Sequence, residues 1–144
     1  MANSYRQFSF ALKLKDKTEA SWFRKLLSKA ARTEDLESGG TLHDFEATVV
    51  VPNHSKDETI PHVWFQDNGE YGNVEQIATI VETYLKKFRP RGYFIMTWAD
   101  TCSKHRLGEF GGGTAVVTSK KTHWFSESEF VKQVTKGKLF MRNA

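Results

Sequence analysis

The sequence predicts an α+β fold with a ferredoxin-like β-α-β-β-α-β core, to which a fifth strand and a short C-terminal helix are added. Three observations lead to this prediction. Three segments carry helix signals, five others have the alternating or β-branched pattern of strands, and the two kinds follow one another in that order. A chain of 144 residues, 39% of them hydrophobic, can bury one core, so we expect a single domain over residues 1–144.

The first strand is expected over residues 7–14, because large apolar side chains stand at every second position and would share one buried face. A helix follows directly. Asp16 and Glu19 have the spacing of a capping box, and apolar residues continue at helical steps until about Arg32.

The middle of the chain predicts a β-hairpin and a second helix. Residues 45–51 and 62–66 are rich in β-branched and aromatic side chains and are separated by a polar turn. Asn73 with Gln76 forms a second capping pattern, and apolar residues then repeat every three or four positions until Pro90 ends the helix.

The fourth predicted strand, residues 93–98, is unusual because both of its faces are apolar. One face carries Tyr93 and Ile95, and the other carries Phe94, Met96 and Trp98. A fifth strand is expected over residues 114–118, at the edge of the sheet beside the fourth. The short C-terminal helix, which begins at Ser126 and contains Phe130, is expected to cover the second of these faces. The alternative is that Phe94, Met96 and Trp98 remain exposed and stack on bases or dock a protein.

The basic residues are concentrated in the second half of the chain. Residues 73–144 carry 12 Lys and Arg against 6 Asp and Glu, whereas residues 1–72 carry 9 against 11, and the net charge is +4. Such an excess suits nucleic acid or an acidic protein surface as partner. A solvated basic face without a partner is the simpler alternative.

The connection between the last two predicted strands, residues 98–113, contains the highest concentration of ionisable and reactive side chains. It contains Trp98, Asp100, Cys102, Lys104, His105, Arg106, Glu109 and the glycines 111–113. An enzyme would use Cys102 as nucleophile, His105 as base and Glu109 or Asp100 as the orienting acid. The plainer interpretation is a half-buried thiol in a loop that Asp100 and Glu109 tie down through Lys104 and Arg106. The glycines would then serve positive φ angles or a close approach of two chains.

The single cysteine excludes an intramolecular disulfide, and it leaves too few ligands for a structural zinc site. We therefore expect no metal and no cofactor. The sequence shows no signal-peptide pattern and no apolar run of membrane-spanning length, so we expect a cytoplasmic protein without a membrane partner.

The segments Trp98-Ala-Asp-Thr-Cys-Ser-Lys and Gly108-Glu-Phe-Gly-Gly-Gly resemble a W-A-[DE]-T-C-S-K-x-R-x-G-E-F-G-G-G signature. That signature is found in a family of small uncharacterised proteins of phage, plasmid and bacterial genomes, for which no activity is established. The resemblance implies a common fold and transfers no catalytic residue. A mobile-element setting implies a protein that modulates or inhibits a host machine, such as a defence nuclease.

We therefore predict a non-enzymatic binding module that engages a macromolecular partner, with a protein as the first choice. Its binding residues would be Trp98, Asp100, Lys104, Arg106, Arg89, Arg91, Lys120 and Lys121. A nucleic-acid-binding protein, a cysteine-dependent enzyme and a homodimer that buries the second face of the 93–98 strand are the alternatives.

Overall fold

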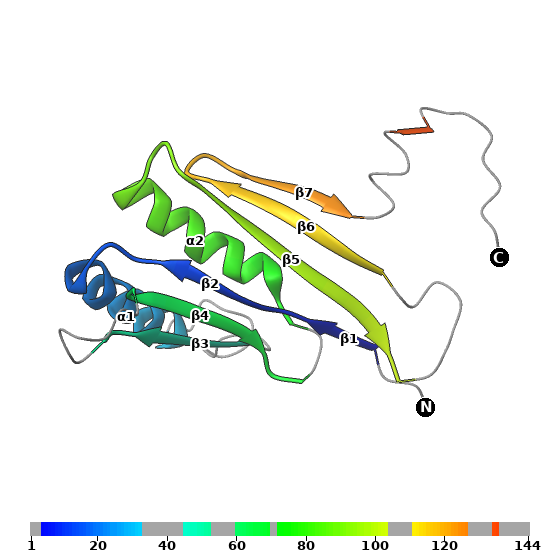
Figure 1. Cartoon of the computed structure of the whole chain (residues 1–144), viewed down its shortest axis with the longest axis horizontal. Helices are drawn as coiled ribbons and strands as arrows, with labels where there is room; N and C mark the ends of the chain where they lie inside the picture. The colour runs from blue at the N-terminus through cyan, green and yellow to red at the C-terminus, as the bar shows by residue number, and fades with distance from the viewer. Residues whose placement is uncertain are drawn as a thin grey trace.

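The computed structural model describes residues 4–32, 45–52, 60–69, 72–103, 111–126 and 134–135. Within these ranges the chain forms two helices and seven strands, and every strand is antiparallel to its neighbours (Figure 1). The elements are β1 (Ser4–Gln7), β2 (Ser9–Lys13), α1 (Lys17–Arg32), β3 (Phe45–Val50), β4 (His62–Asp67), α2 (Val74–Phe88), β5 (Tyr93–Cys102), β6 (Gly111–Thr118) and β7 (Thr122–Ser126).

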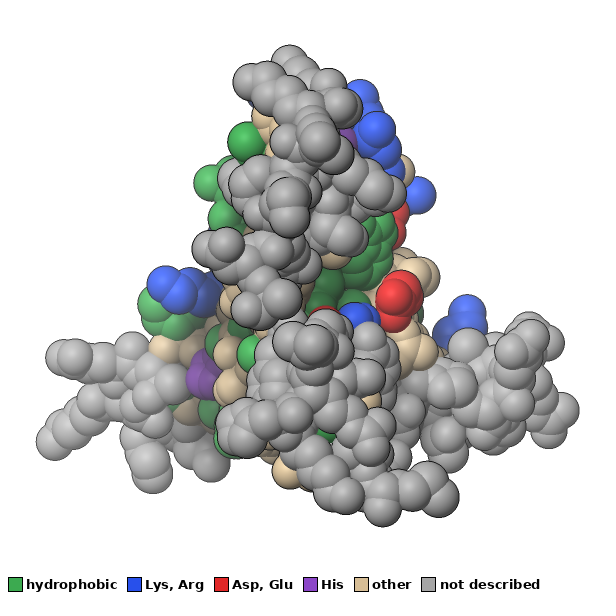
Figure 2. Space-filling view, turned by 90° about the vertical axis from the view of Figure 1, so that its right-hand side faces the viewer, with side chains coloured by type: hydrophobic (Ala, Val, Ile, Leu, Met, Phe, Trp, Pro, Cys, Tyr) green, Lys and Arg blue, Asp and Glu red, His purple; other side chains and the backbone are tan. Residues whose placement is uncertain are grey.

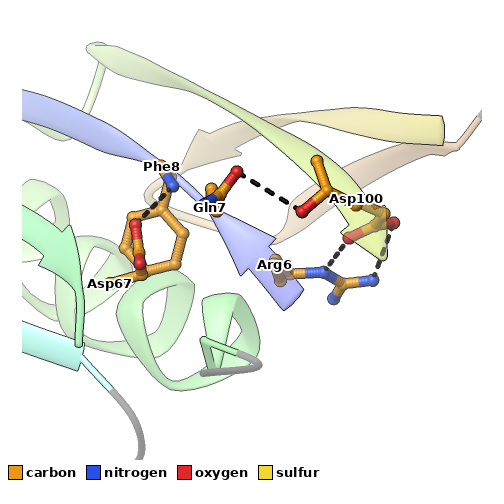
Figure 3. Close-up of polar contacts among 6 residues, drawn as sticks. Arg6, Gln7, Phe8, Asp67 and Asp100 are labelled. Carbon is orange, nitrogen blue, oxygen red and sulfur yellow. Dashed lines mark hydrogen bonds and ion pairs between the residues drawn. The ribbon is translucent and has the colours of Figure 1, made fainter. Parts of the chain in front are cut away.

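The strands form two sheets, one with the order β1-β5-β6-β7 and the other with the order β2-β4-β3. The chain passes from the first sheet to the second at Phe8, the one residue between β1 and β2. Asp67 holds this crossing point. Its carboxylate Oδ1 accepts a hydrogen bond from the Phe8 N–H at 2.9 Å, and its own N–H donates to the Phe8 carbonyl at 3.2 Å (Figure 3).

The predicted ferredoxin-like core is wrong. It required a single sheet built on one strand over residues 7–14, whereas the chain has seven strands divided between two sheets. The physical origin of the difference is the break at Phe8. The segment before it pairs with β5 and the segment after it pairs with β4, because the Asp67 side chain takes the Phe8 N–H that one continuous ladder would have used.

The edge of the first sheet also differs from the prediction. The strand expected over residues 114–118 is β6, but β7 lies beyond it, so β6 is an inner strand. The predicted C-terminal helix begins at Ser126, where β7 ends, and most of its residues lie outside the described part of the chain.

The two long helices and the hairpin are close to their predicted bounds. Asp16 Oδ1 accepts from the Glu19 N–H at 3.0 Å at the start of α1, and Asn73 Oδ1 accepts from the Gln76 N–H at 3.0 Å at the start of α2. Strands β3 and β4 pair in antiparallel fashion over their whole length, as expected for the hairpin. These elements were predictable because their signals lie within a few residues of one another along the chain.

The core lies between the helices and the sheets. Its largest fully buried side chains include Tyr84, Phe23, Phe65, Ile77 and Met96. None of the helices in the described ranges is both long enough and apolar enough to cross a membrane.

One polar group is built into this core. The Tyr84 hydroxyl donates a short hydrogen bond to the carboxylate of Glu19, which is itself only 4% exposed. Arg89 Nη2 lies 3.4 Å from the same carboxylate, so the buried charge has a cationic partner. Burial and the bond to Glu19 raise the pKa of Tyr84.

Candidate functional site

The structure divides the predicted binding residues into two groups at opposite ends of β5. Arg89 and Arg91 precede the strand, whereas Trp98 and Asp100 lie in its second half. A strand of ten residues at about 3.3 Å per residue is roughly 30 Å long. The two groups therefore belong to separate surfaces, and no small ligand contacts both.

The group at the far end of β5 is held together by Arg6 of β1. Arg6 donates to the Asp100 carboxylate from Nε at 2.8 Å and from Nη2 at 3.3 Å (Figure 3). Its guanidinium also lies 5.3 Å from the centroid of the Trp98 ring, at cation–π distance. Trp98 in turn contacts Trp124 of β7 edge-on, with ring centroids 5.9 Å apart. The partner of the Asp100 carboxylate is thus Arg6, whereas the sequence suggested Lys104 or Arg106.

The glycines of β6 are explained by a close approach of two strands. A Cβ atom on Gly113 would lie 2.7 Å from Cε2 of the Trp98 ring, and one on Gly112 would lie 2.6 Å from the Trp98 carbonyl oxygen. Neither residue has a positive φ angle, which leaves the close approach as the reason for these glycines. The Trp98 ring lies flat over β6 because no side chain there displaces it.

The proposed catalytic residues are only partly described. Cys102 is half-buried at the end of β5, opposite Ser4 of β1. His105 and Glu109, together with the predicted binding residues Lys104 and Arg106, lie outside the described residues. In the ranges that the structure describes, no three His, Cys, Asp or Glu side chains are grouped so that they could hold a metal ion.

The face of the 93–98 strand that was expected to be covered is covered, but the helix that the structure describes on it is α2. The face that carries Phe94, Met96 and Trp98 is turned toward the interior, and Met96 is completely buried. Helix α2 lies on this side of the sheet, where its Glu82 accepts a hydrogen bond from Thr122 at 3.0 Å. The predicted cover for these side chains was the C-terminal helix.

The exposed side of the sheet is the opposite one, which we call the outer face. The register of β5, β6 and β7 places two rows of side chains across it. The first row is Ile95, Val116 and His123, and the second is Thr97, Thr114 and Phe125, with Tyr93 and Thr118 at one end of the rows. Figure 2 shows hydrophobic side chains on both flanks of the upper part of the molecule, which β5, β6 and β7 occupy in Figure 1.

The outer face combines exposed large hydrophobic side chains with threonines and His123. Tyr93 is 67% exposed, Ile95 52% and Phe125 40%, although all three are large hydrophobic side chains. No Lys, Arg, Asp or Glu stands at any of the outward positions of β5, β6 and β7 within the described ranges. A water-facing side of a sheet normally carries charged residues as well as polar ones, so the lack of Lys, Arg, Asp and Glu distinguishes this face.

The other predicted group gathers at the opposite end of the sheet, which we call the basic end. It consists of Lys86, Lys87, Arg89, Arg91, Lys120 and Lys121. The Ser119 hydroxyl donates to the Pro90 carbonyl at 2.7 Å and thereby fixes the β6–β7 turn against the turn that leads into β5. Figure 1 shows the end of α2 and both turns at the same end of the molecule.

The outer face is not among the predicted binding surfaces. The sequence carries a signal for it, because the 93–98 strand is apolar on both faces, but this pattern does not indicate which face a helix covers. His123 and Phe125 were missed because no strand was predicted over residues 122–126. The alternation of Thr122, Trp124 and Ser126 with these two residues is consistent with a strand and could have shown it.

Comparison with known proteins gives no further assignment: no family model, no curated protein and no solved structure matches this chain.

Proposed function

We propose that this protein is a non-enzymatic binding module that docks a protein partner on the outer face of its four-stranded sheet. The observation that carries the proposal is the exposure of Tyr93, Ile95 and Phe125 on a sheet face that has no charged side chain among its described residues. Three large hydrophobic side chains exposed on one uncharged sheet face favour a surface that a partner covers.

The composition of the outer face favours a protein partner. The centres of protein–protein interfaces are depleted of charged residues and enriched in aromatic ones, which is the pattern found here. A sheet that binds nucleic acid over its whole face needs cations between its aromatic residues to neutralise the phosphates. The outward residues between Ile95 and Phe125 are Thr, Val and His, and none of them supplies a fixed positive charge.

The family resemblance agrees with this kind of activity. A small protein of a phage or plasmid that modulates a larger host machine, such as a defence nuclease, acts by covering a surface and needs no catalytic residue. The partner in this proposal is a protein surface that is itself apolar and flat enough to meet an antiparallel sheet.

The test compares two variants with matched exposure. Ile95 and Ile60 are both 52% exposed, but Ile95 lies on the outer face and Ile60 precedes β4 in the other sheet. Tagged wild-type, Ile95→Glu and Ile60→Glu proteins are used for affinity purification from a lysate of the source cells, with and without nuclease, followed by mass spectrometry. We expect a stoichiometric, nuclease-resistant protein with the wild type and with Ile60→Glu. A charge in the centre of an interface costs about 2 kcal/mol or more, a roughly 30-fold loss of affinity, so Ile95→Glu should not retain this partner.

Two results would contradict the proposal. One is equal recovery of the partner by both variants, and the other is a wild-type protein that retains nothing. Light scattering on the purified protein tests whether a second copy of the chain binds to the outer face. A wild-type dimer that Ile95→Glu converts to a monomer would identify a second copy of the chain as the partner.

A further inference from the structure

The basic end concentrates positive charge from three separate segments. Lys86 and Lys87 lie in the last turn of α2, Arg91 in the turn before β5, and Lys120 and Lys121 in the turn between β6 and β7. All five side chains are exposed. The hydrogen bond from Ser119 to Pro90 brings the turns together, so charges that lie up to 35 positions apart in the sequence form one surface.

One carboxylate of α2, that of Glu82, lies beside this charge, where it accepts a hydrogen bond from Thr122, but among the described residues it forms no ion pair with any of the five cations. Arg89 forms an ion pair with Glu19. Arg89 is therefore committed to a structural partner, and Lys87 lies 5.7 Å from the centroid of the Phe88 ring, whereas Lys86, Arg91, Lys120 and Lys121 form no ion pair among the described residues. Lys86 and Lys87 lie at the C-terminal end of α2, where cations stabilise the helix through its dipole. Arg91, Lys120 and Lys121 lie outside the helix and have no such role.

The two lysines of the β6–β7 turn are also dispensable for the turn itself. The turn is held by the Thr118 side chain and by backbone atoms of the two lysines, because the N–H groups of Lys120 and Lys121 donate to Thr118 Oγ1 at 3.3 and 3.2 Å and the Lys121 carbonyl accepts from the Thr118 hydroxyl. Both side chains are thus available to a ligand. Their replacement leaves every one of these hydrogen bonds in place.

An exposed aromatic ring borders this charge. Tyr93 follows Arg91 by two residues and pairs with Thr118, two residues before Lys120. At 67% exposure it is more open to solvent than any other large hydrophobic residue in the described ranges. A cationic surface beside an open aromatic ring is the combination that binds single-stranded nucleic acid, because the cations take the phosphates and the ring stacks on an unpaired base.

We infer that the basic end binds single-stranded nucleic acid, with phosphates on Arg91, Lys120, Lys121 and the lysines of α2, and with one base stacked on Tyr93. This site goes beyond the proposed protein docking and shares only Tyr93 with the outer face. A duplex is the weaker ligand, because its bases are paired and stacked and offer nothing to the Tyr93 ring.

Fluorescence anisotropy with labelled oligo(U) and oligo(dT) of about 12 nucleotides tests the inference, because such a length matches the site size of a small single-strand-binding surface. A duplex of the same length is the competing probe. If about four phosphates are neutralised, the affinity should fall about 50-fold between roughly 50 and 200 mM salt. Lys120→Glu/Lys121→Glu should weaken binding at least about 10-fold and flatten this salt dependence. Tyr93→Ala should weaken binding about 5-fold or more and leave the salt dependence unchanged, since it removes a stacked base and no charge.

The matched control is Arg24→Glu/Lys25→Glu, which makes the same change in net charge at two adjacent exposed residues of α1. It should retain most of the binding. The inference is overturned if the wild type binds the single strands with a Kd above about 100 µM at low salt, if the control loses as much as the Lys120/Lys121 variant, or if Tyr93→Ala binds normally and the duplex binds equally well. Loss of the nuclease-resistant protein partner in the Lys120/Lys121 variant, with unchanged oligonucleotide binding, would instead assign the basic end to the protein interface.

Discussion

The contact between Trp98 and Gly113 can be tested by adding a single methyl group. In Gly113→Ala the new Cβ would lie 2.7 Å from Cε2 of the indole, so the ring has to move. Displacement of the ring loses its cation–π contact with Arg6, worth about 0.5–1 kcal/mol, and its edge contact with Trp124, worth about 0.5–1.5 kcal/mol. The reduced chain entropy of Ala in a strand returns about 0.5–1 kcal/mol. We expect a net loss of roughly 0–2 kcal/mol in the free energy of unfolding.

The assay is urea denaturation of Gly113→Ala in two backgrounds, wild type and Trp98→Val. Without the indole the new methyl group meets no obstacle, so Gly113→Ala should be neutral or slightly stabilising in the Trp98→Val background. Gly112→Ala is the matched control, because its Cβ would lie 2.6 Å from the Trp98 carbonyl oxygen, which the Val variant retains. Its cost should be the same in both backgrounds. Equal costs of Gly113→Ala in the two backgrounds would refute the explanation given for this glycine.

Two further predictions concern buried and half-buried groups. Because the pKa of Tyr84 is raised in the folded protein, its neutral form is stabilised, and its contribution should be complete below about pH 10 and be lost as the pH rises further, by up to about 1.4 kcal/mol per pH unit. Urea midpoints of wild type and Tyr84→Phe should therefore approach each other as the pH rises above about 10, and parallel pH profiles would disprove the role of Tyr84. Cys102 is half-buried, and for a binding module we expect it to react with a thiol reagent at neutral pH no faster than free cysteine. A rate about ten times higher, abolished in Cys102→Ser, would argue for the cysteine-dependent enzyme instead.

Local signals in the sequence were sufficient for the elements that depend on neighbouring residues. The caps at Asp16 and Asn73 and the helical repeats behind them lie within one or two turns of chain, and both helices are found where the pattern puts them. The pairing of strands is different in kind. The change of strand partner at Phe8 depends on Asp67, a residue 59 positions away, and the sequence around Phe8 does not predict this change.

The candidate site was predictable to a similar degree. The basic residues Arg91, Lys120 and Lys121 were identified from charge alone, but their grouping with the end of α2 depends on the contact between Ser119 and Pro90. Trp98 and Asp100 were identified from a motif, and the structure gives both of them a neighbour, Arg6, from the other end of the chain. The exposed Tyr93 and Ile95 face of β5 was not predicted as a site, because alternation identifies two faces and does not indicate which of them a helix covers.

The crossing of the chain at Phe8 has a consequence for cooperativity. The segment that contains β1 and β2 supplies one border strand to each sheet, so its detachment would uncover the backbone of β5 and of β4 at the same moment. Because Phe8 alone separates β1 from β2, loss of one border strand is expected to loosen the other. The two sheets are therefore expected to open and close as one unit in hydrogen exchange, with amides of β4 and β5 sharing the same opening free energy, even though no strand of one sheet is hydrogen-bonded in the ladder of the other.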